Sequence, residues 1–237
     1  MHYMNTRTHS KGGEFWNKEY RSGNNLALSD NPSSDLERFM RWYEREQKEA
    51  YKHPEILLDI GCGNGRNLIY LAKNYGLRGH GYDISKEAID QAKKKSDDLP
   101  LEYSVLSMTE PIPLPDNSVD LVLDMMSSHF LNEEGRSKLL AEISRVLRPG
   151  GWFFWKTFLL TEDKNAQRLI HDHPAGEKNS YIHPKIGVLE HVFTEGEIED
   201  LLESDFFVHR MVKSHRHKKR GKANKRRSIS VYAQRTS

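Results

Sequence analysis

Apolar positions in the middle of the chain form short continuous runs that alternate with segments of helical spacing. The runs have the length and composition of buried strands, and they lie at residues 56–60, 78–83, 101–106, 119–123 and 152–158. Between them, apolar residues recur three and four positions apart at about 66–74, after Ser85, and at about 133–147, which indicates amphipathic helices. Strands that alternate with helices in this way are typical of an α/β fold.

The region before the first strand contains one further helical pattern. Residues Met1 to Gly13 show no periodicity, and we expect them to be disordered. A helix is predicted to begin at Ser34 or Asp35, which are suitable N-caps, and to run to about Tyr51. The chain then enters the first strand after the helix-terminating pair His53-Pro54.

The last part of the chain returns to regular patterns after an irregular stretch. Thr194 with Glu197 three residues later has the pattern of a capping box, which predicts a helix at 196–204. Apolar and polar residues alternate at 206–213 and again at 228–234. These two segments are predicted to be the last two strands of the sheet.

Three glycines at alternate positions, Gly61, Gly63 and Gly65, follow the first predicted strand. Glycine adopts positive φ angles at low cost and, because it lacks a Cβ, lets a ligand lie against the backbone. The helix after the turn directs free N–H groups and the positive end of its dipole towards such a ligand. Asp83 ends the second predicted strand about 20 residues later, where an acid accepts hydrogen bonds from ribose hydroxyls in nucleotide-binding βαβ units. Together, the turn and the acid predict a nucleotide site.

Five blocks of sequence resemble, in order, the motifs of the class I S-adenosylmethionine-dependent methyltransferases. The blocks are Asp59–Gly65 (DIGCGNG), Gly81–Ser85 (GYDIS), Ile112–Asp120 (IPLPDNSVD), Leu121–Asp124 (LVLD) and Arg145–Gly151 (RVLRPGG). The resemblance implies a Rossmann-like, doubly wound α/β sheet of seven strands, with the last strand antiparallel and helices on both faces. It also implies a methyltransferase with S-adenosyl-L-methionine as cofactor. A dinucleotide dehydrogenase is the alternative, but its fingerprint is G-x-G-x-x-G, whereas this turn reads G-x-G-x-G.

The resemblance assigns cofactor contacts to residues of these motifs and their neighbours. These residues are Asp59, Gly61, Cys62, Gly63, Gly65, Asp83, Ile84, Ser107, Met108, Asp124 and Met125. Ser107 departs from the family, because many members carry an acid there that accepts from the adenine amino group, although a hydroxyl can also accept. Trp16 and Tyr20 resemble a segment that folds over the cofactor as a lid. Packing of a terminal helix against the core would explain these two aromatic residues equally well.

Asp124 and His129 are the candidate catalytic residues. Ligands of open α/β sheets bind beyond the carboxyl ends of the strands, so the segment from Asp124 to His129 is expected to face the reactive end of the cofactor. Methyl transfer from a sulfonium is an in-line displacement in which alignment supplies much of the rate. A general base is required only when the acceptor is protonated at neutral pH. The Asp/Asn-Pro-Pro-aromatic signature of methyltransferases that act on DNA amino groups is absent from this segment.

The composition argues against a membrane-embedded or secreted protein. Charged residues make up 30% of the chain, the mean hydropathy is -0.78, and no apolar run approaches the roughly 20 residues of a membrane span. The N-terminus lacks the apolar core of a signal peptide, and Cys62 is the only cysteine, which fits a reducing cytoplasm. We expect no membrane partner, an N-terminal segment of residues 1–53 that contains a lid and a helix, and one methyltransferase domain of residues 54–237.

Residues 161–190 are irregular and rich in histidine, including the H-x-H pair His171 and His173. We interpret these as solvated loop histidines, because no cysteine accompanies them and the other histidines are irregularly spaced. No metal site is therefore predicted. In the resembled family the insertion after the fifth strand usually shapes the substrate pocket, so one of these histidines is a further candidate base.

Positive charge is concentrated in one short segment, residues 215–227. It contains eight cations and no acid, namely Arg216, Lys218, Lys219, Arg220, Lys222, Lys225, Arg226 and Arg227. Because the whole chain carries a net charge of +2, the remainder carries −6. As the tip of the hairpin between the last two strands, this segment resembles a phosphate-contacting loop, which favours RNA as the substrate. A small-molecule substrate, a protein substrate and a non-catalytic activator that binds cofactor or RNA are the alternatives.

Overall fold

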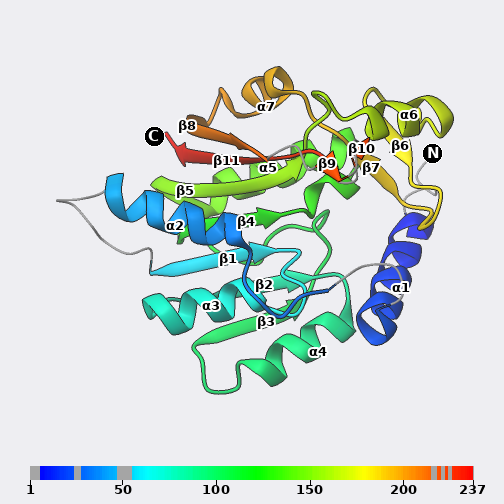
Figure 1. Cartoon of the computed structure of the whole chain (residues 1–237). Coiled ribbons are helices and arrows are strands. Elements are labelled where there is room, and N and C mark those ends of the chain that lie inside the picture. Colours follow the sequence, from blue (N-terminus) through cyan, green and yellow to red (C-terminus); the bar gives the residue numbers. More distant parts are fainter. Residues whose placement is uncertain are drawn as a thin grey trace.

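A sheet of seven strands forms the centre of the molecule, in the order β3-β2-β1-β4-β5-β11-β8 (Figure 1). The computed structural model describes residues 6–23, 28–46, 55–214, 218–219, 222–223 and 226–236. The strands of the sheet are β1 (Ile56–Ile60), β2 (Arg78–Asp83), β3 (Leu101–Val105), β4 (Val119–Met125), β5 (Leu147–Phe158), β8 (Phe206–Lys213) and β11 (Ser228–Arg235). β1 to β5 are parallel, whereas β11 is antiparallel to both of its neighbours, β5 and β8. The predicted seven-stranded sheet with an antiparallel last strand is therefore confirmed.

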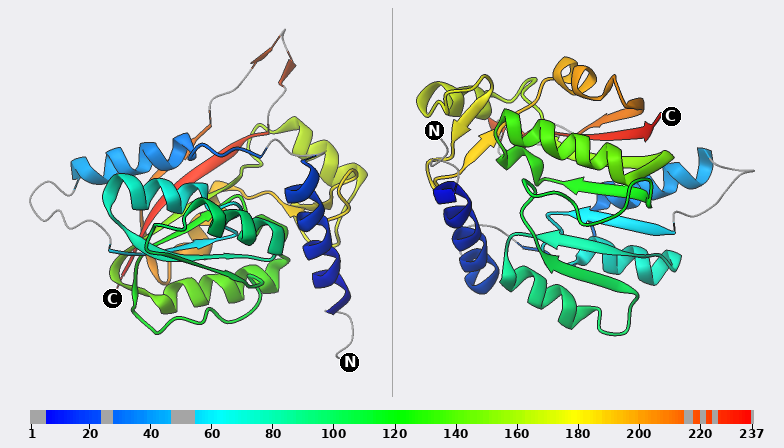
Figure 2. Two further views of the ribbon diagram at one scale, coloured as in Figure 1. Left: turned by 90° about the horizontal axis from the view of Figure 1, so that it is seen from below. Right: turned by 180° about the vertical axis from the view of Figure 1, so that it is seen from behind.

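Helices cover both faces of the sheet (Figure 2). The helices are α1 (Thr6–Ser22), α2 (Ser34–Glu46), α3 (Arg66–Tyr75), α4 (Lys86–Lys95), α5 (Glu133–Val146), α6 (Lys164–Asp172) and α7 (Glu195–Leu202), with one 3-10 turn, η1 (Ser128–Phe130). Side chains of α2, α3 and α4 join the core on one face, and side chains of α5 and α7 join the core on the other. α1 lies instead beside the carboxyl ends of the parallel strands (Figure 1). In the described part of the chain, no helix is long and apolar enough to cross a membrane.

The starts of these helices follow from polar residues with suitable side chains. The Ser85 hydroxyl accepts a hydrogen bond from the N–H of Ala88 at the start of α4, and the Asn132 side chain caps α5 in the same way. The predicted capping box of α7 is present, because Thr194 and Glu197 each accept from the other's backbone N–H. Each cap thus fixes the residue at which its helix begins.

α2 covers its part of the sheet with an aromatic face. Phe39 is 1% exposed and stacks on Phe154 of β5, with the ring centroids 4.9 Å apart and an interplanar angle of 17°. It also meets Tyr232 of β11 edge-on at 5.0 Å, and Trp42 meets Trp152 edge-on at 5.3 Å. Because large aromatic side chains bury much apolar area, this contact joins the N-terminal segment to the domain that follows it.

The N-terminal segment differs from its prediction. α1 begins at Thr6, so the prediction of disorder is wrong for residues 6–13, and the first five residues lie outside the described part. The helix docks through Asn17, whose Oδ1 accepts from Ser85 Oγ at 3.0 Å and from Glu87 N at 3.1 Å. Sequence periodicity within α1 did not signal these contacts with a distant helix. α2 ends at Glu46, and its predicted continuation to about Tyr51 falls outside the described residues.

The region predicted to be irregular, residues 161–190, contains regular elements. It holds α6, β6 (Ser180–Ile182) and the start of β7 (Leu189–His191), and the two strands pair in an antiparallel ladder. Further on, β9 (Lys218–Lys219) and β10 (Lys222–Ala223) pair with each other, as expected for the tip of the predicted hairpin. This small ladder projects away from the layers of the domain (Figure 2).

Candidate functional site

A large cavity opens at the carboxyl ends of β1, β2 and β4. Its volume is about 1030 Å³, near the upper end of the 300–1,000 Å³ range that is typical of ligand sites. Most predicted cofactor residues line it, namely Trp16, Tyr20, Gly61, Cys62, Gly63, Asp83, Ile84, Ser107, Met108 and Met125. The cavity is therefore large enough to hold a cofactor and a second molecule beside it.

The glycine turn has the geometry that the sequence predicted. Gly61, Gly63 and Gly65 have φ angles of 67°, 56° and 76°, all in the left-handed region that favours glycine. A Cβ at Gly61 would collide with Ser127 Oγ, and a Cβ at Gly63 would collide with the Tyr20 hydroxyl. Gly65 packs instead against Tyr103, away from the cavity lining. At Gly61 and Gly63 the turn therefore presents backbone without a side chain to the cavity.

Asp83 holds this turn in place. Its carboxylate accepts hydrogen bonds from the N–H of Gly63 at 2.9 Å and from the N–H of Ser85 at 2.8 Å. Burial raises the pKa of Asp83, and the two backbone donors oppose that rise. Since two oxygens offer about four acceptor positions, a carboxylate with two such bonds can also accept from ribose hydroxyls. Its place on the cavity wall fits that role.

Asp59 provides a buried oxygen that needs a partner. Its side chain is 1% exposed and does not line the cavity, and Oδ2 has no hydrogen-bond partner among the described residues. Burial raises the pKa of Asp59 well above its usual value, Arg66 opposes this rise, and Asp124 and Asp83 add to it. Three carboxyl groups at adjacent strand ends favour a positively charged ligand. S-adenosylmethionine, with its ammonium and sulfonium groups, has the chemistry that this cluster fits.

Replacing Asp59 by asparagine is expected to stabilise the ligand-free protein and to weaken cofactor binding. A carboxyl whose pKa is raised on folding contributes stability below its unfolded pKa of about 4, and this contribution is lost as the pH rises through the folded pKa. Asparagine does not titrate, so thermal denaturation at pH 8 should show a higher Tm for the variant, whereas at pH 4 the difference should shrink. Binding of S-adenosylhomocysteine at pH 8 should weaken by about tenfold. A variant less stable than the parent at pH 8 would contradict this account.

Neither candidate base faces the cavity. Asp124 is 1% exposed, and its Oδ1 accepts from the N–H groups of Ser127 at 3.2 Å and Ser128 at 3.1 Å, so it orders the backbone after β4. Burial raises its pKa to about 6. His129 is also 1% exposed and lies between the rings of Phe130 and Phe158, with centroid distances of 4.0 and 4.9 Å.

These positions do not fit the predicted catalytic roles of Asp124 and His129. Burial, followed by the charges of Arg226 and His191, lowers the pKa of His129 to about 3, and its ring nitrogens have no partner among the described residues. The prediction assumed that every residue after a strand end faces the ligand, and the catalytic roles of Asp124 and His129 stay a prediction that their burial does not support. The 3-10 turn η1 rotates His129 into the interior instead, and Met126, Ser127 and Phe130 line the cavity.

Met126 adopts a strained backbone conformation on the cavity wall. Its φ angle is 67°, and its N–H donates to the carbonyl of Lys156 at 2.8 Å. A left-handed conformation costs an L-residue roughly 1–2 kcal/mol, and such residues concentrate at functional sites. The strain aims the Met126 side chain into the cavity.

Replacing Met126 by glycine is expected to raise stability. The variant relieves the left-handed strain but increases the freedom of the unfolded chain, so the net gain should be about 0.5–1 kcal/mol, or roughly 2 °C in Tm. Met126→Ala is the matched control, since it removes the side chain and keeps a Cβ at the same φ. Scanning calorimetry that shows equal Tm values for the two variants would mean that the backbone at this position is not strained.

α1 closes one side of the cavity. Trp16 and Tyr20 line it, which favours the lid interpretation over simple packing against the core. The Trp16 ring meets Phe130 edge-on at 5.2 Å, and the Tyr20 carbonyl accepts from Gln91 Nε2 at 2.8 Å. Burial, followed by the charge of Asp83, raises the pKa of Tyr20. The neutral Tyr20 hydroxyl thus lies next to both the turn and Asp83.

The cavity also has walls for which the sequence named no residue, although the resemblance implied that the insertion after the fifth strand shapes the substrate pocket. They come from the turn after β3, from η1 and the start of α5, and from the loop between β6 and β7, and they include Thr109, Glu110, Phe130, Leu131, Asn132, Glu134, Gly135, Lys138, Ile182, Gly187, Val188 and Leu189. Ser107, the departure from the family pattern, lines the cavity and pairs its hydroxyl with that of Thr109 at 2.9 Å. Only the fold brings these segments together, and no motif in the sequence marks the loop between β6 and β7.

Two of the eight predicted phosphate-contacting cations are used inside the protein. The Arg226 guanidinium pairs with Asp163 at 2.9 Å and Glu190 at 3.3 Å and lies over the Phe158 ring at 4.2 Å. The Arg227 N–H donates to Asp163 at 3.0 Å, and its guanidinium donates to a backbone carbonyl. Both residues were predicted to lie in the hairpin tip, but the acids that they pair with lie in the preceding insertion, so phosphate contact by these two residues stays a prediction. Arg216, Arg220 and Lys225 fall outside the described residues.

Histidines of the insertion do not form a metal site in the described structure. His171 is 89% exposed and pairs with Asp172 at 2.9 Å, and His173 is also exposed. Across the residues that the structure describes, no group of three or more His, Cys, Asp or Glu side chains is arranged to hold a metal ion.

Comparison with known proteins shows that parts of the chain are similar to methyltransferases. A fatty-acid O-methyltransferase of Mycolicibacterium smegmatis is 29% identical over 143 residues, which are 60% of this chain and 51% of that protein. Phthiotriol/phenolphthiotriol dimycocerosates methyltransferase 1 of Mycobacterium ulcerans is 29% identical over 131 residues, or 55% and 46% of the two chains. The chain thus spans about half the length of these curated relatives. A solved S-adenosylmethionine-dependent methyltransferase of Methanosarcina mazei has a TM-score of 0.70 at 22% identity, over 87% of this chain and 99% of that one, and shares the fold.

The match to a family model covers the part of the sheet that builds the site. Residues 58–155 fit the model described as a methyltransferase domain, and this range runs from β1 through most of β5. It includes the glycine turn, Asp83 and the strand end at Asp124. Over residues 58–155 the chain is therefore similar to the methyltransferase domain family.

Proposed function

We propose that this chain transfers a methyl group from S-adenosyl-L-methionine to a small molecule that carries its acceptor atom on an apolar body. The observation that supports this proposal is the second half of the cavity, beyond the cofactor residues. There the wall includes Phe130, Leu131, Ile182, Val188 and Leu189, which suit an apolar molecule. The two curated relatives are named as a fatty-acid O-methyltransferase and a phthiotriol/phenolphthiotriol dimycocerosates methyltransferase, which agrees with a small-molecule acceptor.

The chain itself binds the cofactor and the acceptor, aligns them with each other and excludes water from the site. S-adenosylmethionine, when bound, supplies a methyl group that is activated by a positively charged sulfur. Asp83 is placed to accept from ribose hydroxyls, and the cluster of Asp59, Asp83 and Asp124 favours the positive charges of the ligand. The apolar walls would hold the acceptor in line and keep water out, and alignment of two bound reactants can supply about 7–11 kcal/mol of a barrier.

The acceptor's own acidity decides whether a base is needed. Among the described residues that line the cavity there is no histidine, whereas Glu110 and Glu134 are present. An acceptor that is already ionised at neutral pH would need no base. A neutral hydroxyl would have to use one of these two carboxylates.

RNA is the second candidate, and the basic segment supports it. Lys218, Lys219 and Lys222 lie on the projecting β9–β10 ladder, away from the domain layers (Figure 2). The internal pairing of Arg226 and Arg227 reduces the cations available for phosphate. With no RNA-modifying protein among the relatives described above, the small molecule is the better supported substrate.

Transfer of label from methyl-labelled S-adenosylmethionine tests the proposal. The purified chain is incubated separately with an apolar metabolite extract, total RNA and total protein, after calorimetry has established binding of S-adenosylhomocysteine. We expect label in the apolar extract. Label confined to RNA, with transfer that falls steeply as salt increases, would support the second candidate instead. Binding without label in any fraction would favour the non-catalytic alternative.

A further inference from the structure

The second half of the cavity lies between two segments that are far apart in the sequence. One wall consists of η1 and the start of α5, with Phe130, Leu131 and Gly135 facing the cavity. The opposite wall is the loop between β6 and β7, with Ile182 and Val188 facing it. Because the two walls are far apart in the sequence, tertiary contacts set the distance between them, including the packing of β7 against η1.

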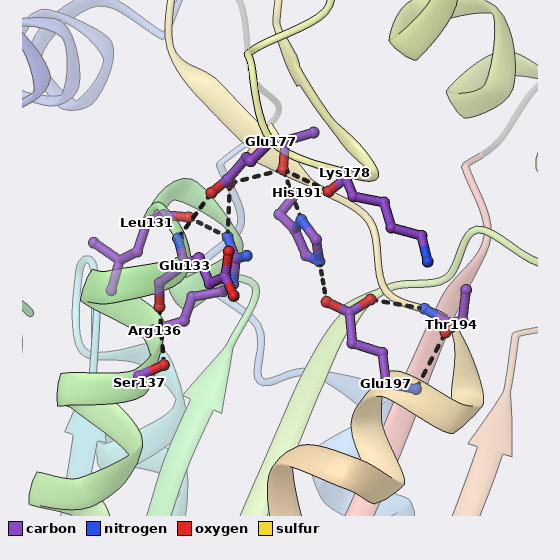
Figure 3. A network of polar contacts seen from close by, with 10 residues as sticks. Leu131, Glu133, Arg136, Ser137, Glu177, Lys178, His191, Thr194 and Glu197 are labelled. Carbon is purple, nitrogen blue, oxygen red and sulfur yellow. Dashed lines mark hydrogen bonds and ion pairs between the residues drawn. The ribbon is translucent and has the colours of Figure 1, made fainter.

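Glu177, just before β6, connects the two walls (Figure 3). Its Oε2 accepts from the Glu133 N–H, at the start of α5, at 2.9 Å. Its Oε1 accepts from Arg136 Nη1 at 3.1 Å and from Ser180 Oγ at 2.8 Å. Arg136 Nη1 also donates to the carbonyl of Leu131 at 2.6 Å. One carboxylate therefore holds the first turn of α5 and the first residue of β6 together.

A second set of contacts fixes β7 at the end of the ladder where His191 pairs with Ser180 (Figure 3). His191, the last residue of β7, joins Ser180 Oγ through Nδ1 at 2.7 Å and Glu197 Oε1 through Nε2 at 2.6 Å. Glu197 in turn forms the capping box of α7 with Thr194. Both strands that carry the loop are thus fastened to helices of the domain.

The pair of Arg136 and Glu177 is shielded enough to act as a rigid connection. The two side chains are 8% and 18% exposed, and the Arg136 guanidinium lies 5.7 Å from the Phe193 ring centroid. Burial opposes ionisation of Glu177, but the bonds from Glu133, Ser180 and Arg136 together hold its pKa below its usual range. Neither side chain lines the large cavity, and in the described part of the chain neither forms a hydrogen bond or ion pair with the glycine turn, Asp59 or Asp83.

We infer that Arg136 and Glu177 are positioning residues that set the separation of the two apolar walls and thereby select acceptors by the size of their apolar part. This inference rests on the proposed function, because it concerns the acceptor half of the same cavity. The pair acts through Leu131 on one wall and through β6, which carries Ile182, on the other. Loss of the ion pair between Arg136 and Glu177 lets the loop between β6 and β7 move relative to α5. Acceptors with a larger apolar part then fit, and the acceptor that the parent protein prefers binds less tightly.

The test compares acceptor profiles of variants with methyl-labelled S-adenosylmethionine and an apolar metabolite extract, separated by chromatography. Glu177→Gln removes the charge and places an amide N–H₂ within reach of Arg136. We expect its labelled products to spread to larger acceptors, and kcat/KM for the parent's best acceptor to fall by roughly tenfold to a hundredfold, mainly through KM. The Kd of S-adenosylhomocysteine should stay within about twofold of the parent's, since the cofactor half is untouched. Glu203→Gln, at an exposed carboxylate, is the matched control.

Arg136→Lys keeps the positive charge and tests the same contact with a smaller change, in case Glu177→Gln does not fold. We expect an intermediate profile from this variant. If every folded variant keeps the parent's acceptor profile, the inference is overturned. It is also overturned if a variant loses affinity for S-adenosylhomocysteine together with acceptor selectivity, because the pair would then serve general stability. Absence of label in apolar acceptors with the parent protein would instead reject the proposed function.

Discussion

Asp83→Ala is expected to weaken binding of S-adenosylhomocysteine by a hundredfold or more. Charge-assisted hydrogen bonds contribute about 1.5–3 kcal/mol each, so loss of two bonds to ribose hydroxyls corresponds to at least about a hundredfold in Kd. The same carboxylate also accepts from the N–H groups of Gly63 and Ser85, so the variant loosens the glycine turn that approaches the ligand. Isothermal titration calorimetry on the purified protein measures this Kd.

Two further variants separate these contributions of Asp83. Asp97→Ala removes an exposed carboxylate after α4 and should leave the Kd unchanged. Asp83→Asn keeps one acceptor oxygen but adds an N–H₂ group, so it should fall between the parent and Asp83→Ala. A Kd for Asp83→Ala within about threefold of the parent's would place the ribose elsewhere in the cavity and remove the main support for the cofactor assignment.

Phe39→Ala is expected to produce the largest loss of stability. Truncation of a buried phenylalanine costs about 3–5 kcal/mol, a large share of the 5–15 kcal/mol that stabilises most domains. Phe39 contacts Phe154 and Tyr232, and Trp42 and Trp152 pack around the same site, so the cavity left behind cannot collapse easily. Thermal denaturation should show a Tm lower by roughly 10 °C.

The effect of Phe39→Ala should be confined to stability. Phe39 lies on α2, away from the residues that line the cavity, so the Kd of S-adenosylhomocysteine measured well below the Tm should remain close to the parent's. Arg41→Ala, on the exposed side of the same helix, should leave the Tm almost unchanged. A small Tm change for Phe39→Ala would mean that α2 covers the sheet without stabilising it.

The features of the fold that could be predicted from the sequence are those set by residues close together in the chain. The glycine turn and Asp83 are separated by one helix and one strand, so their spacing alone predicted that they would meet. The capping box at Thr194 was also a local signal, and the structure confirms it. The first part of α1, residues 6–13, was predicted to be disordered, and the docking of the helix was missed because it depends on Asn17 meeting Ser85 and Glu87 at the start of another helix.

The individual residues of the substrate half could not be predicted for the same reason, although the resemblance implied that the insertion after the fifth strand shapes the substrate pocket. Whether His129 points into the cavity or away from it depends on a single 3-10 turn, which hydrophobic periodicity does not specify. Arg226 belongs to a run of cations in the sequence, but its partners Asp163 and Glu190 lie at opposite ends of the insertion. The segment that forms the second apolar wall, residues 182–189, is short and lacks a motif. Contacts between distant segments, rather than residue type, decide the role of each of these residues.

The position of β11 between β5 and β8 has a consequence for synthesis on the ribosome. β8 precedes β11 in the chain, and β11 is its ladder partner in the seven-stranded sheet. While β8 has emerged and residues 228–235 are still being translated, both β5 and β8 present unpaired backbone edges, and Phe207 on β8 is 60% exposed even in the folded protein. Such edges promote association between nascent chains. Fast translation of the segment between the two strands, or a chaperone bound to β8, would therefore raise the yield of folded protein.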